Sequence, residues 1–79
     1  MKKTNMIRSY FREDELEIRV YKDKVDVINY DSIGHFDSNK VIIYYENGHM
    51  IVTGLNLVVS KLLKDEVLVV GDIKNIELR

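Results

Sequence analysis

The sequence predicts a small all-β domain, and three observations carry that prediction. Of the 79 residues, 26 are Val, Ile or Leu, and the β-branched majority favours pleated strands over helices. Alanine, the strongest helix former, is absent, and so is proline. Short apolar stretches recur about every eight to ten residues between polar turns, the pattern of a sandwich or small barrel. We therefore expect an antiparallel meander of about seven or eight short strands curled into a sandwich or barrel.

The chain divides into a tail, residues 1–14, which we expect to be flexible, and a single β domain, residues 15–79. Alternation of apolar and polar residues begins with the domain and predicts half-buried strands. The predicted strands cover residues 16–21, 25–30, 33–36, 41–46, 49–53, 55–63, 67–70 and 73–78. These segments follow one another too closely for βαβ crossovers, so the pairing should be antiparallel.

Five residues are interpreted as structural turn residues. Asn47-Gly48 tolerates positive φ at both central positions of a type I′ turn, which predicts a two-residue hairpin. Gly54 ends a strand or permits a bulge, and the Asn56 side chain can satisfy backbone groups left open beside it. Gly71 belongs to the next turn.

Three segments are apolar without interruption: residues 41–45, 57–59 and 67–70. A strand with one wet face should alternate, so an unbroken run requires cover on both faces. A barrel rim, a ligand pocket or a subunit interface could supply the cover, and we favour the interface. Adjacent Tyr44 and Tyr45 point to opposite faces, so one should pack in the core and the other be exposed. The residues predicted to form the interface are Val41, Ile43, Tyr44, Tyr45, Val58 and Val69.

Composition excludes some kinds of site and argues against others. The absence of cysteine excludes disulfides and thiolate metal sites, and agrees with a cytoplasmic location. A net charge of −1 is not that of a nucleic-acid-binding surface. No apolar run approaches the roughly 18–20 residues that span a bilayer. Two alternatives remain: a barrel that binds a small apolar ligand, and a nucleic-acid-binding barrel that uses the basic arm of Lys2, Lys3, Arg8 and Arg12.

Catalytic and metal-binding groupings do not stand above chance. His35, His49, Asp37 and Glu46 could be imagined as a site of two histidines and a carboxylate, but each histidine flanks a turn, where exposure is ordinary. The acidic residues Glu13, Asp14, Glu15 and Glu17 are interpreted as solvent-exposed side chains where the first strand begins. We therefore expect no metal, no cofactor and no enzymatic activity.

Three groups of residues, in order along the chain, resemble the YabP/YqfC family of sporulation proteins. Residues 28–33 stand where the family has an Ile-Glu-Asn-aromatic-Lys-Gly-Ile-like segment, with Asp31-Ser32 in place of Lys-Gly. Residues 48–57 resemble its Gly-x-Ile-x-Ile-x-Gly-x-Asn-Leu segment, with Met50 where Ile is common. The third group matches in spacing and consists of Leu62, Glu66-Val67, Gly71, Ile73 and Ile76-Glu77.

The resemblance covers roughly residues 15–79. It implies a protein of endospore-forming bacteria, made in the mother cell, with a part in spore coat assembly or forespore maturation. It also implies a non-enzymatic protein that works with a companion membrane protein, and it transfers no catalytic residue. The resemblance implies a location in the mother-cell cytoplasm, at the forespore or spore surface. Small size and strands that are apolar on both faces add the expectation of a homo-oligomer.

Overall fold

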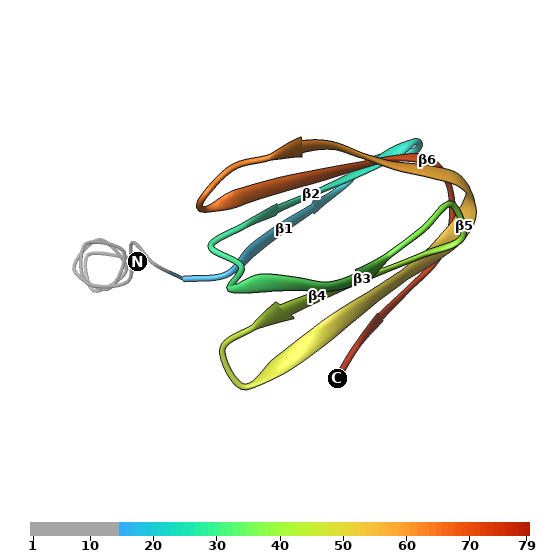
Figure 1. Ribbon diagram of the computed structural model, residues 1–79. Helices are drawn as coiled ribbons and strands as arrows, with labels where there is room; N and C mark the ends of the chain where they lie inside the picture. The colour runs from blue at the N-terminus through green and yellow to red at the C-terminus, as the bar shows by residue number, and fades with distance from the viewer. Residues whose placement is uncertain (1–14) are drawn as a thin grey trace, which may run out of the picture.

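The computed structural model describes residues 15–79, which form one antiparallel sheet bent onto itself (Figure 1). Its strands lie in the order β1-β2-β6-β5-β4-β3. They are β1 (Glu17–Val20), β2 (Lys24–Ile28), β3 (Ser32–Phe36), β4 (Lys40–Tyr45), β5 (Gly48–Leu62) and β6 (Glu66–Leu78). The all-β antiparallel prediction is confirmed, with six strands instead of seven or eight. The predicted flexible tail lies outside the described residues.

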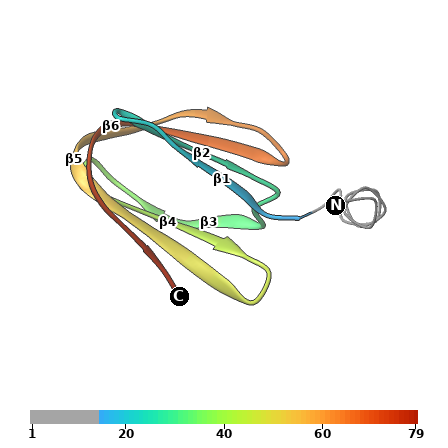
Figure 2. The same cartoon turned by 180° about the vertical axis from the view of Figure 1, so that it is seen from behind.

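The two long strands β5 and β6 connect the two layers of the fold. The first layer contains β1, β2, residues 66–70 of β6 and residues 57–62 of β5. The second layer contains β3, β4, residues 48–53 of β5 and residues 73–78 of β6. Figures 1 and 2 show β5 and β6 curving from one layer into the other on the side away from the N-terminus.

The bend between the layers lies where breaks between strands were predicted. Asn56 has φ 56° and Gly71 φ 147°, and the register of the β5–β6 ladder shifts between Leu55 and Val58. A Cβ on Gly71 would lie 2.7 Å from the Asn56 carbonyl oxygen, and one on Gly54 would lie 2.1 Å from that of Asp72. The predicted break at Gly71 is therefore corrected to a corner within a continuous strand, whereas at Gly54 the bulge, one of the two predicted alternatives, is confirmed by the register shift between Thr53 and Gly54. The ladder resumes beyond them because bulges and left-handed residues turn a strand without ending it.

The β3–β4 connection is bonded to the corner of β5. The Gly54 N–H donates to the Asn39 carbonyl at 3.0 Å, and the Asn39 side-chain amide donates to the Gly54 carbonyl at 3.1 Å. The Leu57 N–H donates to the Ser38 carbonyl at 2.9 Å. These bonds satisfy backbone groups that the corner would otherwise leave open.

The predicted β4–β5 hairpin is present, but its turn is one residue earlier in the chain. Tyr45 pairs with Gly48, so the two connecting residues are Glu46 and Asn47. Only Asn47, with φ 71°, has positive φ in this turn. The assignment of Gly48 to a type I′ turn was wrong, because Gly48 is already the first residue of β5.

The core lies between the layers and is entirely hydrophobic. Its nine buried residues are Val25, Val27, Val41, Ile43, Met50, Val52, Leu57, Val67 and Val69. Burial of such side chains stabilises the fold by about 1.5–3 kcal/mol each. Three of them, Val41, Ile43 and Val69, were predicted to form an interface. They are 0% exposed, so that prediction was wrong for these three: the bend lets the chain cover them itself.

Candidate interaction surface

Four strand edges remain open in residues 15–79. β1 and β3 end the sheet on its two sides. β2 pairs with β6 only at residues 66–70, and β4 pairs with β5 only at residues 48–53. The last parts of β5 and β6 therefore each have a partner on one side only. Open edges offer backbone N–H and C=O groups to another chain.

Each open edge has a large apolar side chain that faces the core side yet is exposed. Residues directly opposite one another in a ladder point to the same face. The exposed residues lie opposite the buried Val25, Val41, Val67 and Met50. They are Val20 of β1 (59% exposed), Phe36 of β3 (60%), Leu62 of β5 (58%) and Leu78 of β6 (59%). Apolar side chains thus extend from the shared, fully covered core to exposed positions along both sides.

The remaining predicted interface residues lie in different places. Val58 is exposed on the outer face of the first layer, opposite Val70. Tyr44 is exposed on the outer face of the second layer, and its ring lies 5.6 Å from that of His49. Tyr45 packs against the core, as expected for one of the two tyrosines, and its hydroxyl donates to the His49 carbonyl at 3.2 Å.

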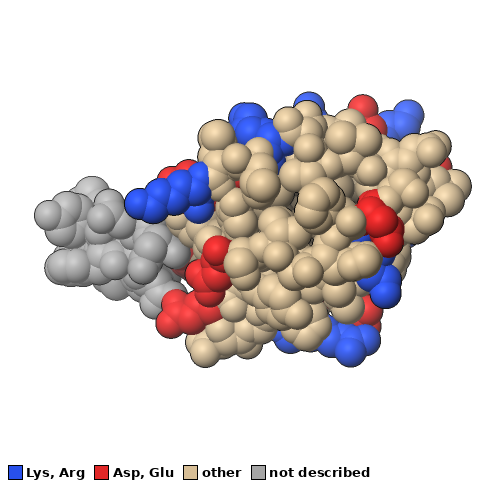
Figure 3. All heavy atoms as spheres, in the orientation of Figure 1, with Lys and Arg blue, Asp and Glu red and all other residues tan. Residues whose placement is uncertain are grey.

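Charged side chains lie around the margin of the face shown in Figure 3, and its centre is uncharged. Residues 15–79 carry eight Lys and Arg against eleven Asp and Glu, so the described domain is mildly acidic. Such a surface does not favour polyanions, whose binding requires clustered basic residues. The basic arm proposed for nucleic acid lies outside the described residues.

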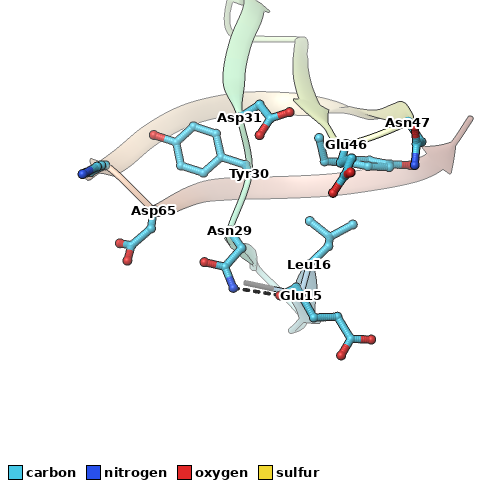
Figure 4. Close-up of a pocket in the computed structure, with 10 residues that line it drawn as sticks. Glu15, Leu16, Asn29, Tyr30, Asp31, Glu46, Asn47 and Asp65 are labelled. Carbon is cyan, nitrogen blue, oxygen red and sulfur yellow. Dashed lines mark hydrogen bonds between the residues drawn. The ribbon is translucent and has the colours of Figure 1, made fainter. Parts of the chain in front are cut away.

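A hollow of about 760 Å³ opens at the end of the fold where residues 15 and 16, just before β1, meet the β2–β3, β4–β5 and β5–β6 connections (Figure 4). Four carboxylates line it, those of Glu15, Asp31, Glu46 and Asp65. Figure 4 shows Asp65 and Glu46 on opposite sides of it. An open, acid-lined hollow lacks the enclosed apolar lining that a hydrophobic ligand needs.

The imagined metal ligands do not converge. The His35 Nε2 lies 2.8 Å from Asp37 Oδ2, whereas His49 stacks against Tyr44 and Glu46 lies in the β4–β5 turn. Within residues 15–79, no group of three or more His, Asp or Glu side chains could hold a metal ion.

Asp37 organises the β3–β4 turn. Its Oδ1 accepts the N–H groups of Asn39 and Lys40 at 2.7 and 2.8 Å. The hydrogen bond with His35, followed by these two backbone bonds, lowers the pKa of Asp37 to about 2. These contacts are those of a structural turn whose carboxylate stays ionised.

The outer face of the first layer carries a row of charges. Arg19 lies directly opposite Asp26, and its Nε donates to Glu17 Oε2 at 2.8 Å. Asp26 Oδ1 has no hydrogen-bond partner, and the neighbouring Asp26 carboxyl raises the pKa of Glu66. Both Arg19 and Glu17 are about half exposed.

The sequence interpretation missed all four exposed edge residues: Val20, Phe36, Leu62 and Leu78. Alternation places Val20 correctly on the apolar face of its strand. The alternating pattern does not show the order of the strands in the sheet. Only that order shows which strands lie at an uncovered edge, and therefore which apolar side chains are exposed there. A polar or charged neighbour on each side, as at Val20, is the one local signal of an edge.

No helix long and apolar enough to cross a membrane occurs in the described part of the chain. In comparisons with known proteins, the model of the YabP family matches residues 13–79. No curated protein and no solved structure matches the chain.

Proposed function

The chain belongs to the YabP family, which is associated with sporulation, and from that premise we propose that it is a non-enzymatic assembly module of spore formation. In this proposal it acts in spore coat assembly or forespore maturation by binding other proteins. Its partners are further copies of itself and a companion sporulation membrane protein. It works in the mother-cell cytoplasm, at the forespore or spore surface.

One observation supports the proposal most: the four core-facing apolar side chains that are exposed at open edges. Isolated exposed apolar residues are ordinary on a protein surface. Here each one extends the buried core to an edge that also offers backbone hydrogen bonds, as at Val20 and Phe36. A strand added from another protein would cover the apolar side chain and at the same time form hydrogen bonds with the open backbone of the edge.

The two alternatives lack a comparable observation. An apolar-ligand barrel needs an enclosed apolar cavity, and the hollow at Glu46 and Asp65 is open and acidic. A nucleic-acid-binding barrel needs basic residues beside exposed aromatic rings. The exposed ring of Tyr44 has His49 beside it, and the exposed ring of Tyr21 has the single base Lys24, 5.1 Å from its centre, which is one pair and not a basic cluster.

The proposal is tested in a sporulating host from which the gene has been deleted. We expect deletion to reduce the yield of heat-resistant spores, and the wild-type gene to restore it. Phe36→Lys should fail to restore it although the protein accumulates and folds, because a charge would replace the apolar edge.

The matched control is Tyr44→Lys, which introduces the same charge on the outer face of the second layer instead of its core-facing side. It should restore spore yield. Normal heat-resistant spores from the deletion strain would overturn the sporulation role. Full restoration by Phe36→Lys would remove this edge from the assembly surface.

A further inference from the structure

The backbone of β1 faces an open edge at alternate residues. The Tyr21 N–H donates to the Lys24 carbonyl at 2.8 Å, so Tyr21 is turned toward β2. The direction alternates along a strand. Arg19 and Glu17 therefore also face β2, and the N–H and C=O groups of Leu16, Ile18 and Val20 face outward, where no described strand lies.

The side chains along this edge alternate between apolar and charged residues. From Leu16 to Val20 they are apolar, acidic, apolar, basic and apolar. Ile18 and Val20 face the core side, opposite buried valines of β2. Glu17 and Arg19 share the outer face and form an ion pair of 2.8 Å.

This pattern is complementary to itself when it is reversed. An antiparallel second copy centred on Ile18 sets Glu17 opposite Arg19 of the second copy, and Arg19 opposite Glu17 of the second copy. The same register sets Leu16 opposite Val20 twice, on the core face. The outward N–H and C=O groups of Leu16, Ile18 and Val20 then face those of the second copy. The three residue pairs can form up to about six hydrogen bonds, two for each pair.

We propose that two copies of this chain associate through β1 in this register, across a two-fold axis, so that their first layers become one continuous sheet. The proposal deepens the proposed function and rests on it, because it identifies a second copy of the chain as the occupant of one open edge. An isologous contact of this kind closes after two subunits.

Charge complementarity selects the second copy over an unrelated strand. Arg19 already lies opposite Asp26 of β2, so pairing places its guanidinium between two carboxylates. Opposite charges directly across a ladder are favourable and like charges are unfavourable. The 59% exposed Val20 gains Leu16 of the second copy as a neighbour on the core face.

β1 is also the one open edge described whose ladder is regular along its whole length. Register shifts interrupt β3 between Ile33 and His35, and β5 between Val59 and Lys61. The register of β6 shifts where it pairs with Thr53 and Gly54 of β5. Bulges of this kind protect an edge from pairing with another chain, and β1 has none.

Sedimentation velocity of the full-length chain, from micromolar to millimolar concentration, tests the proposal. We expect the wild type to be a reversible dimer. Arg19→Glu leaves two acids on the edge and Glu17→Arg leaves two bases, so each variant should dissociate at least about tenfold more readily. An equimolar mixture of the two variants should recover dimers, because every acid then faces a base.

The control substitution is Arg79→Glu. Glu77 and Arg79 repeat the same acid–base spacing on β6, with an ion pair of 2.7 Å, so the substitution makes the same charge change on another edge. It should leave dimerisation unchanged. Circular dichroism checks that each variant folds. If Arg19→Glu does not fold, a second series replaces it. Dimerisation should then be strongest for the wild type, weaker for Glu17→Gln and weakest for Glu17→Arg.

Three results would overturn the β1 pairing: a wild type that stays monomeric throughout, a mixture that does not recover dimers, or dissociation caused by Arg79→Glu instead of Arg19→Glu. These results are distinct from failure of the proposed function. If the chain is strictly monomeric but its Phe36→Lys variant still fails to restore spores, the proposed assembly role stands and only the proposed self-pairing is lost.

Discussion

Val41 and Val58 offer a matched test of which apolar residues hold the fold together. Both are strand valines predicted from sequence to form an interface, and both can be cut to alanine by the same chemical change. Val41 is 0% exposed and Val58 is 59% exposed. The expected costs therefore differ chiefly through burial, since the same two methyl groups are removed at both positions.

The magnitudes follow from the buried volume that each substitution removes. Val→Ala deletes the equivalent of two methylene groups, worth about 0.8 kcal/mol each when fully buried. At Val41 the cavity left behind raises the cost to about 2–3 kcal/mol. At Val58 less than half of the side chain is buried, so the cost should be about 0.6 kcal/mol or less.

The assay is urea unfolding followed by circular dichroism, at a concentration low enough to keep the chain monomeric. A domain of this size has a total unfolding free energy of roughly 3–10 kcal/mol, so the loss at Val41 is a large fraction of it. Equal losses for Val41→Ala and Val58→Ala would refute the placement of Val41 in the core. So would a Val41→Ala variant that weakens self-association at unchanged stability.

Three further predictions concern the corner and the two shifted carboxyl groups. Gly71→Ala should destabilise the fold by at least about 1–3 kcal/mol in urea unfolding, because φ 147° and a backbone oxygen 2.7 Å from the added Cβ both oppose it; an unchanged midpoint would contradict this account of the bend. The hydrogen bond from His35 lowers the pKa of Asp37 to about 2 from its ordinary 3.8, so the stability that this carboxylate contributes is present above pH 3.8 and is lost as the pH falls from 3.8 toward 2. Asp37→Asn should remove that part of the pH dependence, and an identical acid titration of the variant would show the turn contacts to be unimportant. The Asp26 carboxyl raises the pKa of Glu66, so the stability from this pair is present below the ordinary Glu pKa and is lost as the pH rises through the raised value. Glu66→Gln should therefore be more stable than wild type at neutral pH, and a less stable variant would contradict that sign.

Local sequence patterns predict much of this fold. β-branched composition predicts the all-β class, and the hairpin before Gly48 follows from an Asn-Gly pair between apolar strands. The opposite orientations of Tyr44 and Tyr45 follow from the period of two along a strand. Each of these features depends on residues that are close in sequence.

The parts that sequence interpretation missed depend on contacts between distant segments. Gly54 and Gly71 look like ordinary turn residues, and only the β5–β6 pairing shows that both lie at one corner, where Gly54 is beside Asp72 and Gly71 is beside Asn56. That corner supplies the second layer, which in turn buries Ile43 and Val69. The open edges are beyond local patterns for the same reason, because strand order decides whether Phe36 is covered.

Amide hydrogen exchange along β1, measured at low and high protein concentration, tests most directly whether a second molecule covers this edge. Exchange at Ile18 and Val20, whose N–H groups face outward, should slow as concentration rises. The Arg19 amide faces β2 and is protected in the single chain, so it should exchange more slowly than both at low concentration. Concentration-independent rates at Ile18 and Val20 would contradict the account, whether the amides are unprotected or already covered by the chain itself.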